Sequence, residues 1–247
     1  MPTIEENKGW WSGYDWSENG DEWSGAWGTP LRQWTIGFVP RIGSYLPCRR
    51  ILEIAPGFGR WTQFLLQQCD GYIGLDITPK CIEHCKKRFA DNRNAAFFLN
   101  DGQSLPDMPD GNIDFVFSAD SLVHADETAI NGYLSALSKK LAVGAVGFIH
   151  HSNIGMYNAG GTLLCSNEHM REPTMSANLF RSLCEKSGLK CISQELISWG
   201  QPEFNDCFSV FARLPEGHRL HSQPTVVWTN NSLDKEQIIG RNYGIPI

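Results

Sequence analysis

The chain has 247 residues, of which 41% are hydrophobic and 19% charged, which fits one folded α/β domain and excludes a disordered or fibrous protein. Its formal net charge of −6 has the wrong sign for binding a phosphate backbone, so we expect no nucleic-acid partner. No stretch approaches the roughly 20 apolar residues that cross a bilayer. Because the N-terminus also lacks a basic start followed by an apolar run, we expect a cytoplasmic protein with no membrane partner.

Residues 1–48 form the first predicted segment. Six of the nine tryptophans lie within residues 10–34, among glycines, serines and acids, with no sustained helical or strand period. Aromatic faces stack on sugars and attract cations, so we interpret the segment as a lid in which Tyr14, Trp23 and Trp27 contact an acceptor. The alternative is that these rings are buried along the domain edge or at a dimer interface.

Residues 49–214 alternate between strand-like and helix-like runs. Short apolar runs predict strands at residues 49–55, 72–77, 95–101, 113–120 and 146–153. Runs with helical spacing lie between several of them, at residues 61–69, 80–89 and 127–141. This alternation predicts a parallel sheet with crossover helices.

The end of this domain predicts one more helix, at residues 175–189, and two strands, at residues 189–199 and 206–214. Only a short turn-rich piece separates the two strands. They should therefore pair as an antiparallel hairpin, because a parallel crossover needs a dozen or more residues. We expect residues 215–247 to be a tail that packs on the domain or on a second subunit, which makes a homodimer one alternative.

The eight cysteines do not predict a metal site. The close pair, Cys81 and Cys85, lies on one predicted helix with His84 between them, whereas a structural zinc site would need two such pairs. We expect free thiols that pack as small apolar side chains, and no bound metal.

A glycine-rich turn follows the first predicted strand, with Glu53, Ala55, Gly57 and Gly59 at alternate positions. Glycines permit positive φ and let a ligand approach the backbone, and the helix that follows offers unpaired N–H groups. The spacing differs from the G-x-G-x-x-G of dinucleotide folds, and an acidic strand end would repel a diphosphate. The turn therefore suits a ligand that carries an ammonium and a sulfonium.

Two further carboxylates end the next predicted strands, Asp76 the second and Asp101 the third. The first could accept both ribose hydroxyls, and the second could accept the exocyclic amine of adenine. Either residue alone would more simply be a turn or helix-cap carboxylate. As an ordered pair after the glycine-rich turn, they predict a nucleoside site.

With these three motifs the sequence resembles the class I S-adenosylmethionine-dependent methyltransferases, in which E/D-x-G-x-G-x-G follows the first strand. The resemblance covers residues 49–214. It implies a Rossmann-like α/β sheet of seven strands, mostly parallel with the last strand antiparallel, and S-adenosyl-L-methionine as the cofactor. Ala55 replaces the usual first glycine. The cofactor-binding residues implied by the resemblance are Glu53, Ala55, Gly57, Gly59, Asp76, Ile77, Asp101, Gly102, Gln103 and Ser118.

A hydroxyl acceptor would need a base to remove its proton. The candidates are Asp120 and His124, after the fourth predicted strand, and His151 in the fifth. His150 and His151 must point to opposite faces of the strand, and we favour His151 because it is nearer the strand end, with His150 in the core. His124 has a second interpretation, as a brace for the next helix, and Asp120 could orient a histidine.

His169 and Arg171 lie in a polar loop after the fifth predicted strand, where enzymes of this family hold their acceptors; a plain surface loop is the alternative. The sequence thus predicts methyl transfer to a hydroxyl of a small polar acceptor. The resemblance extends to enzymes that act on sugars in polysaccharide or natural-product pathways. Two alternatives stay open: a small-molecule N-methyltransferase that needs no base, and a nucleotide-binding module without catalysis.

Overall fold

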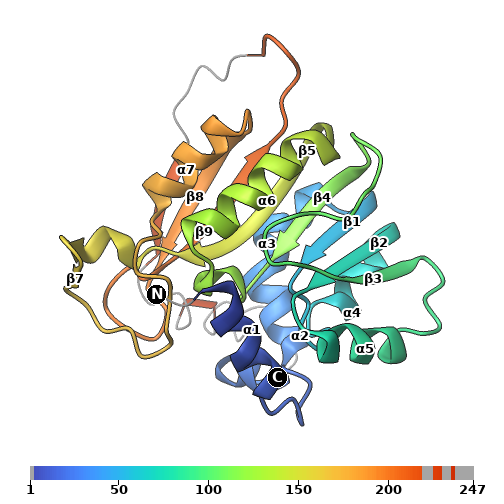
Figure 1. The fold of residues 1–247 in the computed structure, drawn as a ribbon, viewed down its shortest axis with the longest axis horizontal. Coiled ribbons are helices and arrows are strands. Elements are labelled where there is room, and N and C mark those ends of the chain that lie inside the picture. Colours follow the sequence, from blue (N-terminus) through green and yellow to red (C-terminus); the bar gives the residue numbers. More distant parts are fainter. Residues whose placement is uncertain (1–2, 219–224, 230–234, 237–247) are drawn as a thin grey trace.

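The computed structural model describes residues 3–218, 225–229 and 235–236. A single large sheet runs through its centre, with the strands in the order β3-β2-β1-β4-β5-β9-β8-β10 (Figure 1). These strands are β1 (Cys48–Ile54), β2 (Cys69–Asp76), β3 (Ala95–Leu99), β4 (Ile113–Ser118), β5 (Leu141–Ser152), β8 (Lys190–Ile197), β9 (Asp206–Ala212) and β10 (Thr225–Thr229).

The pairing directions confirm the predicted sheet. Strands β1 to β5 pair in parallel, whereas β9 runs antiparallel to both β5 and β8, as the short connection between β8 and β9 requires. The sheet has eight strands where the sequence predicted seven. The additional strand is β10, which pairs in parallel with β8 and comes from the segment that we expected to be a tail.

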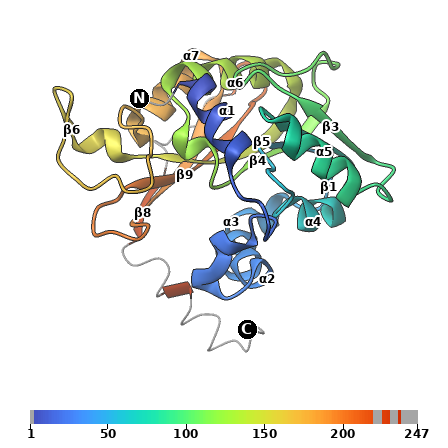
Figure 2. The same ribbon diagram turned by 60° about the horizontal axis from the view of Figure 1, so that its bottom comes forward.

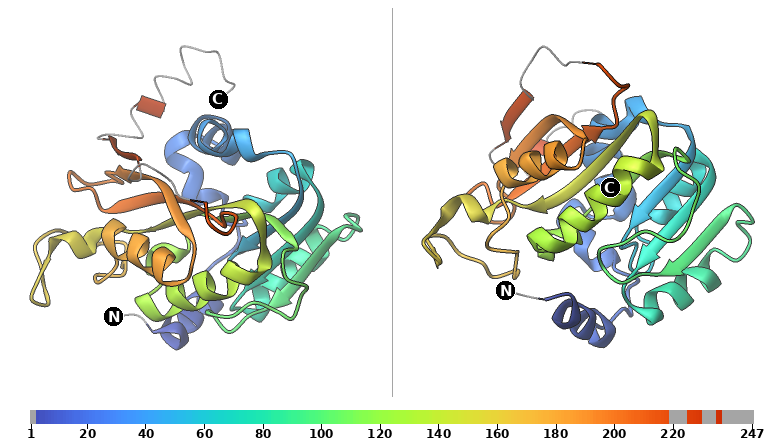
Figure 3. Two further views of the ribbon diagram at one scale, coloured as in Figure 1. Left: turned by 90° about the horizontal axis from the view of Figure 1, so that it is seen from above. Right: turned by 45° about the horizontal axis from the view of Figure 1, so that its top comes forward.

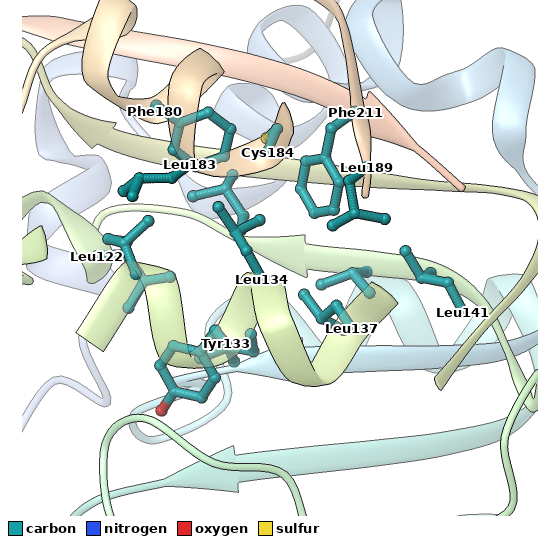
Figure 4. Packing of buried hydrophobic residues seen from close by; sticks show 14 of the residues in the cluster. Leu122, Tyr133, Leu134, Leu137, Leu141, Phe180, Leu183, Cys184, Leu189 and Phe211 are labelled. Carbon is teal, nitrogen blue, oxygen red and sulfur yellow. The ribbon is translucent and has the colours of Figure 1, made fainter. Parts of the chain in front are cut away.

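Two helices, α6 (Glu127–Lys140) and α7 (Ala177–Lys186), cover one face of the sheet. Each begins at a side-chain cap, with Asp126 accepting from the N–H of Ala129 and Ser176 from that of Leu179. Their apolar faces bury leucine and phenylalanine side chains against the sheet (Figure 4). This core holds the strands in place beneath the site described below.

The other face is covered by helices from the first half of the chain, which lie opposite the green and orange helices in Figure 3. These are α2 (Pro30–Gln33), the π-helical turn η2 (Trp34–Phe38), α3 (Val39–Ile42), α4 (Thr62–Leu65) and α5 (Pro79–Arg88). Trp34 and Phe38 are buried in this core with Trp61. Part of the predicted N-terminal segment therefore belongs to the core of the domain.

The first helix, α1 (Ile4–Gly13), crosses the edge of the sheet at which the parallel strands end (Figure 2). A capping box starts it: the Thr3 side chain accepts from the N–H of Glu6, and the Glu6 carboxylate accepts from the N–H of Thr3. The helix is tied to the domain by Asn7, whose Nδ2 donates to the carbonyl of His124 at 3.1 Å. A 3₁₀ helix, η1 (Asp21–Trp27), follows it.

The remaining elements are short. They are η3 (Gly43–Tyr45), η4 (Leu66–Gln68), η5 (Leu122–His124), η6 (Ile154–Tyr157), β6 (Asn158–Ala159) and β7 (Thr162–Leu163). Within the described residues, no helix combines the length and the apolar character needed to span a membrane.

Candidate active site

A cavity of about 460 Å³ lies where the parallel strands end, between the strand ends and the N-terminal segment. Its volume falls in the range of roughly 300–1,000 Å³ found for small-molecule sites. Aromatic rings supply much of its wall: Trp10, Trp11, Tyr14, Trp16, Trp23, Trp61 and Trp199. The described residues contain no group of three or more His, Cys, Asp or Glu side chains arranged to hold a metal ion.

The turn after β1 brings backbone to the cavity wall. Ala55 and Gly57 both line it, and both have positive φ, 59° and 58°. Ala55 therefore adopts the left-handed conformation that suits the glycine it replaces. Gly59, at φ 90°, lies below the wall, where a methyl group would come within 2.4 Å of the ring of Phe89. The glycines here are required by conformation and by close packing.

Asp76 has the position predicted for a ribose carboxylate. It ends β2, is 5% exposed and lines the cavity beside Ile77. Its Oδ1 accepts from the N–H and the hydroxyl of Thr78, at 2.9 and 2.7 Å, and its Oδ2 accepts from the N–H of Gly57 at 3.1 Å. Burial raises the pKa of Asp76, and these hydrogen bonds oppose the rise. Because Oδ2 accepts only one of these bonds, the carboxylate fits a sugar hydroxyl.

Asp101 does not reach the cavity, contrary to the prediction. Its Oδ1 accepts from the backbone N–H groups of Gln103 and Ser104, at 3.0 and 2.7 Å, and its Oδ2 accepts from the Ser104 hydroxyl. The carboxylate is exposed and closes its own turn. Gln103 is also exposed, and only Gly102 of this predicted group lines the cavity. The structure thus gives Asp101 the turn-capping position that was the alternative.

Glu53 and Ser118 lie beneath the turn after β1. Glu53 is buried and accepts from the hydroxyls of Tyr72 and Thr62, at 2.5 and 2.7 Å. Burial raises its pKa to about 7, against the effect of those two bonds. The Ser118 hydroxyl donates to the carbonyl of Ile54 at 2.9 Å. In this arrangement both side chains support the turn from below.

The N-terminal segment covers the cavity. Trp16 stacks on Phe58, with ring centroids 4.8 Å apart and planes at 10°, and a methyl group on Gly57 would lie 2.9 Å from Trp16. Tyr14 and Trp23, predicted to contact the acceptor, both line the cavity and stack on each other. They are thus placed as a lid would be.

Trp27 is elsewhere. It is 4% exposed, packs against Trp199, and donates through Nε1 to Glu236 at 2.6 Å. Because it does not line the cavity, its position matches the alternative of rings buried at the domain edge.

Five charged side chains form a continuous line at the cavity floor, here called the charge chain. Arg60 Nη2 lies 2.6 Å from Asp120 Oδ2. His150 comes next, with Nδ1 3.0 Å from Asp120 Oδ1 and Nε2 3.3 Å from Asp206 Oδ2. Asp206 then accepts from Arg171 Nε and Nη2, at 2.5 and 2.7 Å. Four of the five line the cavity, and Asp206 lies behind them, fully buried.

Burial and pairing shift the pKa values of Asp206 and His150. Burial raises the pKa of Asp206, but the charges of Arg171 and His150 outweigh it and lower the pKa to about 2. Burial lowers the pKa of His150, but the charge of Asp206 and hydrogen bonds to Asp120 and Asp206 raise it above the usual value. His150 Nδ1 lies beside Asp120 and Nε2 beside Asp206, so each ring nitrogen is next to a carboxylate.

His151 points to the opposite face, so the structure reverses the assignment that the sequence favoured. Its Nε2 lies 2.8 Å from the Ser209 hydroxyl, its Nδ1 2.8 Å from the carbonyl of Ser152, and its ring stacks on Phe180 of α7. Burial lowers its pKa to about 4. The cavity is lined by His150 instead, because the two residues alternate across β5.

His124 lines the cavity in a form suited to accept a proton. Its Nδ1 lies 3.0 Å from the carbonyl of Met170. A carbonyl can only accept, so Nδ1 carries the proton and Nε2 keeps its lone pair. Burial lowers the pKa of His124, which leaves the ring neutral near pH 7. His169, from the predicted acceptor loop, also lines the cavity.

The sequence analysis missed the partners that organise this site. Arg60, Asp206 and Trp16 were not singled out, and His150 was placed in the core. The charge chain joins residues that lie 60, 30 and 35 positions apart, and no local motif signals such pairs. Arg60 alone carried a signal, because it follows directly on the glycine-rich turn.

A family model matches part of the chain. Residues 51–144 match the model for a methyltransferase domain. The matched part contains the end of β1, the turn after it and Asp76 at the end of β2.

A curated relative is also a methyltransferase by name. The chain is 27% identical over 148 residues to phosphoethanolamine N-methyltransferase 1 of Arabidopsis thaliana, covering 58% of this chain and 30% of that protein. The matched part thus spans under a third of the relative's length.

Solved structures show the same fold. An S-adenosylmethionine-dependent methyltransferase from Clostridium acetobutylicum has a TM-score of 0.61 at 10% identity. The superposition covers 81% of this chain and 98% of that chain. The N-methyltransferase NodS from Bradyrhizobium japonicum has a TM-score of 0.57 at 14% identity, over 76% and 99%.

Proposed function

We propose that the protein is an S-adenosyl-L-methionine-dependent methyltransferase that methylates a hydroxyl of a small polar acceptor, with a sugar as the acceptor class. The observation that carries the proposal is the tautomer of His124. Its Nδ1–H is held by the carbonyl of Met170, so a neutral Nε2 with a free lone pair belongs to a ring that lines the cavity. A hydroxyl acceptor needs such a proton acceptor, because the oxygen is a weak nucleophile until its proton leaves.

The rest of the cavity supports the same reaction. S-adenosyl-L-methionine, when bound, supplies a methyl carbon already activated by a sulfonium. Asp76 fits the ribose, and the turn from Ala55 to Gly59 brings backbone to the cavity wall for the methionine part. The tryptophan rings exclude water and offer apolar faces on which a sugar ring can stack. The charge chain holds Asp120 and Arg171 in fixed positions, where they can hydrogen-bond the acceptor's other hydroxyls.

A second candidate is N-methylation of a small amine. It is favoured by the similarity to a phosphoethanolamine N-methyltransferase, and the aromatic wall also suits an ammonium product. A neutral amine is already nucleophilic, so this reaction needs no strong base. The two candidates therefore differ in how much they depend on His124.

The deciding experiment assays methyl transfer from labelled cofactor to nucleotide sugars, glycosides and small amines, for the wild type and for His124→Ala. For a hydroxyl acceptor we expect kcat to fall by roughly 10²- to 10⁴-fold in the variant. The affinity for S-adenosyl-L-homocysteine should not change, which serves as the control for an intact cofactor site. Product on an amine alone, with turnover unchanged in His124→Ala, would establish the second candidate instead.

The same assay has an expected pH dependence. The reaction requires neutral His124, and burial lowers its pKa from the usual value of 6.5. The value of kcat/KM should therefore rise with pH through a midpoint below 6.5 and stay level above it. The variant His124→Asn should lose this acidic limb, and a profile that kept it would assign the limb to another group.

A further inference from the structure

One buried polar atom in the cavity wall has no partner. Asn7 of α1 is 9% exposed and lines the cavity. Its Nδ2 donates to the carbonyl of His124 at 3.1 Å, whereas its Oδ1 is buried and accepts no hydrogen bond among the residues that the structure describes. Buried polar atoms in native proteins are nearly always paired, so an unpaired one at a ligand site points to the ligand.

The orientation of the Asn7 amide is fixed by chemistry. The His124 carbonyl can only accept a hydrogen bond, so the nitrogen of the amide must face it. The oxygen is then the atom left unpaired. The cavity at this point therefore presents an acceptor that requires a donor, such as an N–H group of a bound molecule.

The helix that carries Asn7 also contacts the loop after β3. Ile4, three positions earlier in α1 and so on the same side of the helix, closes over Gly102, where a methyl group would come within 2.8 Å of Ile4 Cγ2. Gly102 directly follows Asp101, and Asp76 ends the neighbouring strand β2. Helix α1 thus contacts Gly102 through Ile4 and His124 through Asn7, and Asn7, Gly102 and Asp76 line the same cavity.

The polar side chains that follow β3 do not present an acceptor to the cavity. Asp101 is exposed, does not line the cavity, and accepts three bonds from its own turn. Asn100 does not line the cavity either, and its Oδ1 accepts from the N–H of Gly102 at 2.7 Å and from the hydroxyl of Tyr133 at 2.5 Å.

We propose that Asn7 Oδ1 accepts a hydrogen bond from the exocyclic amine of the adenine ring of the cofactor, the role that the sequence assigned to Asp101. The base would then be read by the N-terminal segment rather than by the strand end. This inference rests on the cofactor and is independent of which acceptor is methylated.

The test compares the binding of S-adenosyl-L-homocysteine and S-inosyl-L-homocysteine by isothermal titration calorimetry, without turnover. The inosyl compound has a carbonyl in place of the amine, which would face the lone pairs of Asn7. We expect the wild type to prefer the adenosyl compound by roughly tenfold or more, since one such hydrogen bond with its mismatch contributes about 1–2 kcal/mol. The variant Asn7→Leu, of similar volume, should lose most of this preference.

Matched variants separate base recognition from folding. Asn7→Asp keeps an oxygen acceptor toward the base but replaces the donor to His124 with a charged oxygen, so its overall affinity should fall while the preference for the adenosyl compound remains. Asp101→Ala should retain all of it. An unchanged ratio in Asn7→Leu, or a ratio that collapses in Asp101→Ala, would overturn the inference. Failure of the wild type to bind S-adenosyl-L-homocysteine would instead contradict the cofactor itself.

Discussion

At the scale of single residues, the charge chain explains how a cavity floor can hold so many ionised groups. Each member lies within 3.3 Å of an oppositely charged neighbour, and buried charges are tolerated only when they are paired in this way. Two members that line the cavity, Asp120 and Arg171, were predicted to act on the acceptor. Their ion pairs hold them in place as hydrogen-bonding groups for an acceptor.

The charge chain predicts how stability depends on pH. The pKa of Asp206 is lowered to about 2, below the roughly 3.9 of an unfolded aspartate. A lowered pKa stabilises the folded state at pH values above about 4, and this stabilisation is lost as pH falls from 4 to 2. The variant Asp206→Asn should be less stable at neutral pH by about 3–5 kcal/mol, because Arg171 keeps a buried charge without its partner.

Urea unfolding between pH 2 and pH 7 measures both effects. The wild type should lose free energy of unfolding more steeply at acid pH than Asp206→Asn. Equal slopes for the two proteins would show that folding does not lower the pKa of Asp206.

Ala55 predicts a stabilising substitution. It holds φ at 59°, a conformation that costs an L-residue with a Cβ roughly 1–2 kcal/mol. Glycine removes this cost but loses more entropy on folding, so Ala55→Gly should raise the free energy of unfolding by about 0.5–1 kcal/mol. Thermal unfolding checks it, and a destabilised variant would mean that the methyl group makes packing contacts worth more than the strain.

The sequence could locate some site residues and not others. The position of Asp76 at the cavity could be predicted because the ends of parallel strands meet at one edge of the sheet. Asp101 was misassigned because a carboxylate three positions before Ser104 can also close its own turn, and only the folded loop decides between the two. His150 and His151 could be assigned to opposite faces, but which face borders the cavity depends on the helices packed there.

At the scale of elements, the strands and helices of residues 49–214 were predictable because each is amphipathic or apolar over a local window. The first 48 residues were not. Most of their helices have only a few residues, and Trp34 and Phe38 pack on residues far along the chain, including Phe117. The edge strand β10 was missed for another reason: its residues are mostly exposed, and it lies in a segment rich in turn formers.

At the scale of the whole molecule, Glu236 joins the two ends of the described chain. It is 6% exposed and accepts from Trp27 Nε1 at 2.6 Å and from Arg41 Nη1 at 2.8 Å. Arg41 also pairs with Glu195 of β8. The N-terminal helices, the sheet and the C-terminal segment therefore share one buried polar junction.

Removing this junction should loosen the N-terminal segment alone. We expect Glu236→Ala to lower the free energy of unfolding by about 1–3 kcal/mol, since Trp27 loses a buried acceptor. Hydrogen exchange should quicken in peptides covering residues 21–42 and stay unchanged in β4. Glu236→Gln, which keeps an oxygen for the indole, should show a smaller effect. Equally faster hydrogen exchange in residues 21–42 and in β4 would contradict a local role for Glu236.

The junction at Glu236 also bears on the order in which the protein is made. Trp27 and Arg41 are synthesised early, but the carboxylate that joins them leaves the ribosome long afterwards. Domains commonly begin to fold from the N-terminal side during synthesis. Here Trp27 and Arg41 cannot complete their contacts until translation has passed residue 236, so the junction between the N-terminal helices and the sheet is finished last.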